Sequence, residues 1–97
     1  MITKSNCLVL WAADWCPACK KMYPIVKKLK AEGYNVYIMD YDENREVAKE
    51  LGIDRLPTTL IFRDGAVVAR HVGVTSAETI KKDLKKNSNP SESRYVT

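Results

Sequence analysis

The chain has 97 residues, 45% of them apolar, which is enough for one small domain with a single core. It contains no apolar run of the roughly 18 residues that a membrane-spanning helix needs, so the sequence predicts no such helix. The net charge is +4, but the lysines cluster on solvent-facing positions of predicted helices without interleaved aromatic residues, which favours solvated surfaces over a nucleic-acid site. The start of the chain, residues 1–6, lacks a signal-peptide layout, so a cytoplasmic protein is expected.

The first half of the chain predicts a strand, a helix and a second strand. Residues 7–11 form a short apolar run, typical of a strand buried on both faces. A helical pattern covers residues 16–32 and ends at Gly33. The alternation from Tyr34 to Asp40 predicts the second strand, parallel to the first through a right-handed crossover. Four residues form the expected inner face of the helix: Ala18, Met22, Val26 and Leu29.

A short helix and a strand hairpin follow. Asp42 is expected to cap a helix that runs to Leu51 and is closed by Gly52. Residues 58–62 and 66–72 predict two strands joined by a tight turn. The expected inner face of the short helix consists of Val47, Ala48 and Leu51.

The last predicted helix begins at a capping box that starts with Thr75. Its expected inner face consists of Ala77, Ile80 and Leu84. From Asn87 onward the chain is polar, so residues 87–97 are predicted to be disordered and residues 1–86 to form the only domain.

Two cysteines stand where the first strand passes into the first helix, in Trp15-Cys16-Pro17-Ala18-Cys19-Lys20. Cys16 is expected at the helix N-terminus, where unpaired backbone N–H groups and the positive end of the helix dipole favour a thiolate and lower the pKa. Cys19 lies one helical turn further on, within reach of Cys16. A CxxC motif beside a β-α-β pattern indicates thiol–disulfide exchange.

The chain has three cysteines, which indicates one working pair and one spare thiol, Cys7. Because Cys7 opens an apolar run, it is expected to be buried in the core, with a regulatory thiol as the alternative. A zinc site is the alternative for the pair, since the cysteines and His71 would supply four ligands. Their spacing matches no usual zinc motif, so no metal is predicted.

These and later landmarks resemble the thioredoxin family. They occur in family order: Ala13-Asp14-Trp15-Cys16-Pro17-Ala18-Cys19-Lys20, Pro24, Asp40-Tyr41-Asp42, Leu56-Pro57-Thr58, Phe62-Arg63-Asp64-Gly65 and Val72-Gly73. The resemblance implies an α/β protein with the minimal thioredoxin fold, β-α-β-α-β-β-α. Its four-stranded mixed sheet has the order 2-1-3-4 and is flanked by helices. Full-length thioredoxins add a strand and a helix in front, and these are not expected here.

The resemblance also implies a function. The protein would be a thiol–disulfide oxidoreductase, an enzyme that reduces protein disulfides with Cys16 as the attacking thiol and Cys19 as the resolving thiol. It would need no cofactor beyond this redox-active pair. Its partners would be disulfide-containing proteins and a thioredoxin reductase or an equivalent electron donor, and it would act as a monomer.

Five residues are expected by resemblance to bind the substrate: Trp15, Pro17, Leu56, Pro57 and Gly73. The family's matching proline is cis and lies against the cysteines, where the preceding backbone can pair with an extended peptide. Without the family, Trp15 could be simple core packing and Pro57 an ordinary strand-entry proline.

Three departures from the family pattern stand out. Pro17-Ala18 replaces the usual Gly-Pro between the cysteines, which leaves the redox potential open. The family's buried aspartate corresponds to Leu10, and the lysine that pairs with it corresponds to Ile38, which leaves the proton route to Cys19 open. The first tryptophan of the family pattern corresponds to Ala12.

Two other functions remain as alternatives. Because a proline directly after the first cysteine is more typical of glutaredoxins, the first alternative is a glutathione-dependent oxidoreductase. The second is an accessory subunit that uses the same surface for binding without redox chemistry.

Overall fold

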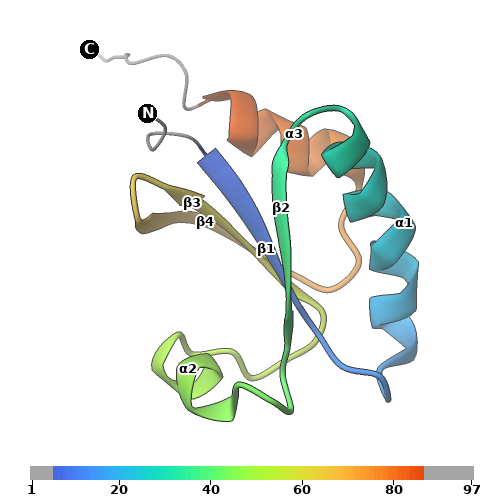
Figure 1. Cartoon of the computed structure of the whole chain (residues 1–97), viewed down its shortest axis with the longest axis vertical. Helices are drawn as coiled ribbons and strands as arrows, with labels where there is room; N and C mark the ends of the chain where they lie inside the picture. The colour runs from blue at the N-terminus through green and yellow to red at the C-terminus, as the bar shows by residue number, and fades with distance from the viewer. Residues whose placement is uncertain (1–5, 87–97) are drawn as a thin grey trace.

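A computed structural model describes residues 6–86 of the chain. It contains seven elements in the predicted order (Figure 1): β1 (Asn6–Ala12), α1 (Pro17–Ala31), β2 (Asn35–Asp40), α2 (Arg45–Glu50), β3 (Thr58–Arg63), β4 (Ala66–Val72) and α3 (Ala77–Lys86). The strands form one sheet of order β2-β1-β3-β4. β1 is parallel to β2 and antiparallel to β3, and β3 is antiparallel to β4. The predicted mixed sheet of order 2-1-3-4 is therefore confirmed.

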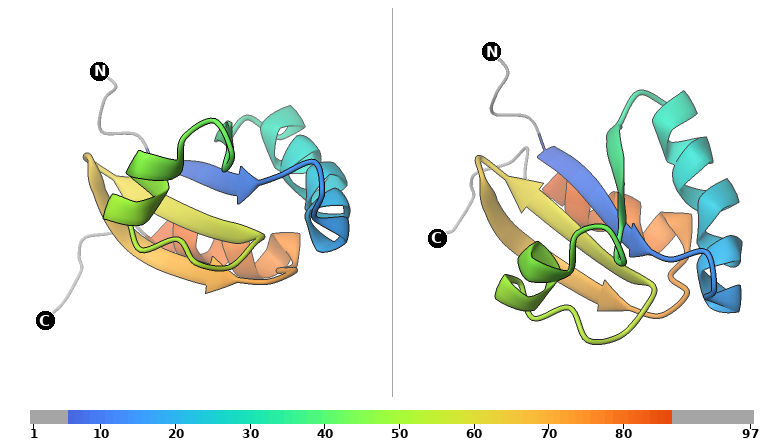
Figure 2. Two further views of the ribbon diagram at one scale, coloured as in Figure 1. Left: turned by 90° about the horizontal axis from the view of Figure 1, so that it is seen from below. Right: turned by 60° about the horizontal axis from the view of Figure 1, so that its bottom comes forward.

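The sheet has an apolar layer on each face, and β1 contributes to both. Leu8 and Leu10 are fully buried on the face covered by α1 and α3, while Trp11 is buried on the face covered by α2. Figure 2 shows α2 and α3 on opposite sides of the sheet. Because β1 has a strand on either side and a helical layer on each face, it can be apolar along most of its length. The C-terminal end of β1, which leads to Cys16, is consequently held firmly in the sheet.

The first helix buries a stripe with the spacing expected of an amphipathic helix. The helix continues through Pro24, and Pro17 occupies one of its first positions, where a missing N–H costs little. Ala18, predicted on the inner face, is only half-buried. The buried residues of the helix are Cys19, Met22, Val26 and Leu29. The resolving cysteine therefore belongs to the core-facing stripe of α1.

The prediction for the short helix was wrong at its start and, on its inner face, for Val47 only, since Ala48 is buried and Leu51 packs against the core. α2 begins at Arg45, its N-cap residue is Asn44, and no side chain caps it. Ala48 is buried, whereas Leu51 is half-buried and Val47 is exposed. With six residues, α2 is less than two helical turns long, so only a small part of its surface faces the sheet.

The last helix is capped one residue later than predicted. Ser76 Oγ accepts the N–H of Thr79 at 3.2 Å, so Ser76 is the capping residue. The Thr75 hydroxyl instead donates to the carbonyl of Gly73. The predicted inner face of Ala77, Ile80 and Leu84 is confirmed, since all three are buried.

β2 lies at one edge of the sheet, and its residues are more exposed than those of the central strand β1. Ile38 is aligned with buried Leu10 but is 52% exposed. A groove of about 480 Å³ separates this strand from α1 and is lined by Tyr23, Val26, Lys27, Lys30, Val36 and Ile38. In residues 6–86, no helix is long and apolar enough to cross a membrane. The tail predicted to be disordered, residues 87–97, lies outside the described residues.

Candidate active site

The two cysteines of the motif form a disulfide at the point where β1 passes into α1. Their Cα atoms are 5.3 Å apart. The N–H of Cys16 donates to the carbonyl of Ala13 at 3.1 Å, which closes the turn between the strand and the helix. The N–H of Cys19 donates to both the carbonyl and the Sγ of Cys16, each at 3.2 Å. Cys16 is thus the N-cap residue of α1, as the sequence predicted, with its sulfur facing a helix N–H group.

The surroundings of the disulfide differ from one side to the other. Cys19 is fully buried and Cys16 is 5% exposed, so solvent reaches only the cysteine at the helix start. Trp15 is 61% exposed, which excludes simple core packing for this side chain. Pro17 is exposed beside it. An open apolar surface therefore adjoins the more accessible cysteine.

The segment before β3 meets the loop after β4 beside this motif. The peptide bond between Leu56 and Pro57 is cis. The N–H of Gly73 donates to the carbonyl of Pro57 at 2.8 Å, and Gly73 has φ of +92°, a conformation that glycine adopts without strain. Leu56 packs against the core cluster that contains both cysteines.

Pro57 and Leu56 differ in what they present to a partner. Pro57 is almost completely buried, whereas Leu56 is half-buried. Of the residues that the sequence analysis assigned to substrate binding, Pro57 therefore offers almost no surface. It can act only by shaping the backbone around it.

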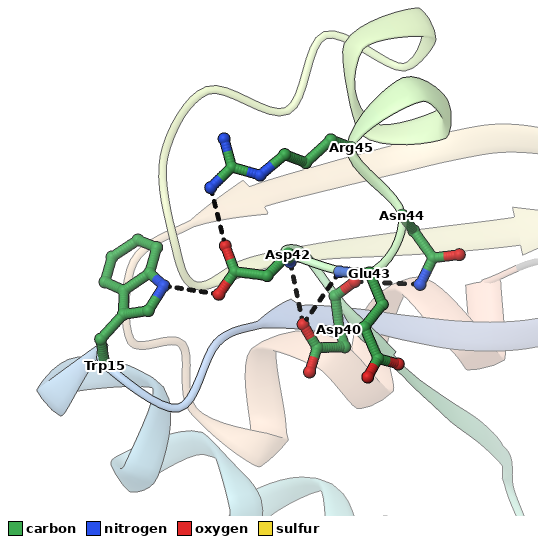
Figure 3. A network of polar contacts seen from close by, with 6 residues as sticks. All are labelled: Trp15, Asp40, Asp42, Glu43, Asn44 and Arg45. Atoms are coloured by element: carbon green, nitrogen blue, oxygen red, sulfur yellow. Dashed lines mark hydrogen bonds and ion pairs between the residues drawn. The ribbon is translucent and has the colours of Figure 1, made fainter.

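A network of polar contacts holds Trp15 to the loop after β2 (Figure 3). The indole N–H of Trp15 donates to Oδ2 of Asp42 at 2.7 Å, and Arg45 contacts Oδ1 of the same carboxylate at 2.9 Å. Asp40 accepts the N–H groups of Asp42 and Glu43 and so shapes the loop. The sequence pattern predicts a helix cap at Asp42, and nothing in the sequence indicates that it binds Trp15.

Within residues 6–86, no carboxylate is buried beneath the disulfide, and the only buried polar residues are Thr58 and Thr59. Leu10 is fully buried in the same cluster as both cysteines, and its neighbour Ile38 is at the exposed edge. Asp40, at the end of the neighbouring strand β2, accepts backbone N–H groups of its own loop.

The spare cysteine and the histidine lie apart from the motif. Cys7, near the start of β1, is half-buried rather than buried as predicted, because it is close to the end of the sheet. Its partial burial raises the pKa of its thiol. His71 contacts Asp83 of α3. Within residues 6–86, no three cysteine, histidine or carboxylate side chains are grouped as a metal site, so the four possible zinc ligands are not brought together.

Comparison with known proteins supports the assignment made from the motif. The family described as Thioredoxin matches residues 1–86. Thioredoxin of Chlamydia muridarum is 34% identical over 82 residues, which cover 82% of this chain and 80% of that protein. Thioredoxin of Bacillus subtilis is 33% identical over 78 residues, covering 77% of this chain and 75% of that protein.

Solved structures agree with the sequence matches. A mutant thioredoxin of Halobacterium salinarum superposes with a TM-score of 0.84 at 28% identity, covering 92% of this chain and 80% of that one. A thioredoxin of Nicotiana alata gives a TM-score of 0.76 at 34% identity, covering 86% and 73%. With these matches and its Cys16–Cys19 disulfide, the chain belongs to the thioredoxin family and is a thiol–disulfide oxidoreductase.

Proposed function

We propose that Cys16 attacks the substrate disulfide and that Cys19 resolves the mixed disulfide. The observation that carries this division is the difference in burial and position between the two cysteines. Cys16 is the one with exposed surface, and as N-cap residue its sulfur accepts a backbone N–H that would stabilise a thiolate. Cys19 has no exposed surface and can reach only a sulfur already bound at Cys16.

The exchange takes place in two balanced steps. In the first, the Cys16 thiolate attacks one sulfur of the substrate disulfide; that S–S bond breaks and the departing substrate thiolate takes a proton from water. In the second, water or hydroxide takes the proton of Cys19, and the resulting thiolate attacks Sγ of Cys16. The mixed disulfide breaks, the second substrate thiol leaves, and the Cys16–Cys19 disulfide forms. Two electrons pass to the substrate, and a thioredoxin reductase or an equivalent donor restores the dithiol.

The substrate surface surrounds Cys16 on several sides. Trp15 and Pro17 supply exposed apolar area, and the backbone of half-buried Leu56 would pair with an extended segment of the substrate. Gly73 leaves space for a chain to approach, since no atom beyond Gly73 and its two chain neighbours lies within 4 Å of the position where a Cβ would stand. Pro57 acts indirectly, by holding Leu56 in place. Protein disulfides, which have a main chain on both sides of the sulfurs, match such a surface better than small disulfides do.

Membership of the thioredoxin family supports a proposal for the oligomeric state, the location, the domain and the cofactor as well. The protein acts as a monomer in the cytoplasm, and residues 1–86 form a thioredoxin-like domain. It needs no cofactor other than the cysteine pair, because both thiols of the exchange are on the chain.

Reduction of insulin in the presence of dithiothreitol tests the proposal. The wild type should accelerate insulin precipitation over dithiothreitol alone, Cys16→Ser should abolish the acceleration, and Cys19→Ser should accumulate a mixed disulfide. Cys7→Ser is the matched control, since it removes a thiol outside the motif and should leave the rate unchanged. Accumulation of mixed disulfide in Cys16→Ser instead of Cys19→Ser would reverse the two roles. Turnover that needs glutathione would identify the protein as glutaredoxin-like.

A further inference from the structure

Met22 contacts the loop that follows β4 through its sulfur atom. It is fully buried and lies three residues after Cys19 on the core-facing stripe of α1. Its Sδ accepts the backbone N–H of Thr75 at 3.3 Å, across 53 residues of sequence. A thioether is a weak acceptor, but it is an acceptor, whereas a leucine of similar volume is not. In Figure 1 the connection from β4 to α3 runs alongside α1.

The contact is the first of three hydrogen bonds that join the segments around the disulfide. The hydroxyl of Thr75 donates to the carbonyl of Gly73 at 3.1 Å. The N–H of Gly73 donates in turn to the carbonyl of Pro57 at 2.8 Å. The bonds connect α1, the β4–α3 loop and the segment before β3. Leu56 of that segment packs against the core cluster that contains Met22 and both cysteines. Met22 is the only one of these residues that stands on the helix carrying both cysteines.

The loop is held by hydrogen bonds at its start, at Thr75 and at its end. Residues 73–76 belong to no helix or strand, and Val74 at its centre is exposed. The glycine at its start is held to Pro57, and Ser76 at its end caps α3. Between these points, the N–H of Thr75 bonds to α1. Loss of the sulfur would leave this half-buried donor without its acceptor, which favours a shift of the loop.

We propose that Met22 is a positioning residue for protein substrates, which sets the distance between the Gly73 loop and the disulfide. The inference rests on the proposed function, since it assigns to the loop a role in binding the substrate's main chain. Met22 does not touch the substrate and takes no part in the exchange. Its sulfur should therefore matter for disulfides embedded in a polypeptide and not for small disulfides, which need only reach Cys16.

The test compares Met22→Leu with Met39→Leu, using steady-state kinetics on insulin and on 5,5′-dithiobis(2-nitrobenzoate). Met39 is the matched control, because it is a half-buried methionine of β2 that packs on the opposite face of the sheet. For Met22→Leu, KM for insulin should rise about fivefold at unchanged kcat, which is the size of one net hydrogen bond. Turnover of the small disulfide should stay unchanged, and so should both activities of Met39→Leu. Amide hydrogen exchange at Thr75 should accelerate in Met22→Leu only.

Other outcomes would overturn the inference. Equal losses with both substrates would show that Met22 merely supports the fold, and unchanged Thr75 exchange would show that the sulfur does not hold the loop. If Met22→Leu does not fold, norleucine can be incorporated for methionine in a Met39→Leu background, which exchanges sulfur for a methylene at nearly constant shape. A rise in KM for insulin and faster amide exchange at Thr75 in the norleucine protein would then support the inference, and the absence of either would contradict it. A wild type inactive on both substrates would instead refute the proposed function.

Discussion

The indole N–H of Trp15 donates to the carboxylate of Asp42 at 2.7 Å, and this bond fixes an exposed tryptophan beside Cys16. Asp42→Ala should release the side chain, because no other hydrogen bond to the indole is present in residues 6–86. The cost in stability should stay below about 1 kcal/mol, since the contact is exposed. Fluorescence anisotropy of Trp15, measured in a Trp11→Phe background, should fall.

Arg45→Gln tests which of its two contacts allows the Asp42 carboxylate to hold Trp15. It removes the ion pair at 2.9 Å but leaves Oδ2 available to the indole. We expect the anisotropy to remain close to that of the Trp11→Phe reference. An equal fall in both variants would mean that Arg45, and not the hydrogen bond alone, orders the tryptophan.

The two solvent-reachable thiols of the reduced protein should ionise in a fixed order. The Cys16 thiol should have a pKa below the value of about 8.5 found for a free cysteine, because its sulfur faces the N-terminus of α1. Partial burial raises the pKa of Cys7. Alkylation by iodoacetamide as pH rises should therefore label Cys16 first and Cys7 last, as read by mass spectrometry of the digested protein. Simultaneous labelling of both would contradict a helix-start effect.

Leu10 keeps the space beneath the cysteines free of charge, and Leu10→Asp should change that. The variant should lose about 3–5 kcal/mol of stability in urea unfolding, since it buries an unpaired carboxyl. The thiols of the variant should titrate together with the new acid, whereas the wild type should show no coupled group. Release of the mixed disulfide in the wild type should therefore depend on water or hydroxide and quicken with pH until Cys19 is ionised.

Leu8→Asp is the matched control for this substitution. Leu8 is equally buried on the same face of β1, one alternation further from the motif. It should destabilise the protein by a similar amount without altering the titration of the cysteines. A strongly coupled acid already present in the wild type would show that another residue replaces the family's aspartate.

The ion pair between Glu32 and Lys81 should give stability a defined dependence on pH. Lys81 Nζ lies 2.9 Å from Glu32 Oε1, and this hydrogen bond holds the pKa of Glu32 below its ordinary value of 4.5 and raises that of Lys81 above 10.5. A carboxyl with a lowered pKa in the folded state contributes stability that is complete above its unfolded pKa and is lost as pH falls through the folded one. The lysine contributes stability that is lost as pH rises through its raised pKa.

Glu32→Gln should therefore be slightly less stable than the wild type at pH 7, and the difference should vanish below the folded-state pKa of Glu32. Urea unfolding between pH 7 and pH 3 measures both. Glu50→Gln, at an exposed position of α2, should follow the wild type throughout. A difference that does not shrink as pH falls below the ordinary pKa of a glutamate would mean that the substitution acts through something other than the charge.

The sequence by itself determined the order of elements and the chemistry at Cys16 and Cys19. The apolar run of β1 and the alternation of β2 are local patterns, and both strands appear within about a residue of their predicted bounds. The position of Cys16 as helix N-cap also followed locally, because a strand, a short turn and a proline at the helix start lie next to each other in the chain. These features depend on neighbours a few residues apart, which a sequence displays directly.

The tertiary structure alone decided which polar groups find each other. Asp42 and Thr75 each have the side chain of a helix cap, and local propensity assigned both to caps. In the fold, Asp42 meets Trp15 of a different element, and the N–H of Thr75 meets the sulfur of Met22. Likewise Ile38, apolar on an alternating strand, is exposed because β2 has a neighbour on one side only. Partners distant in sequence and the position of a strand within its sheet are set by packing the whole chain, and no local pattern encodes them.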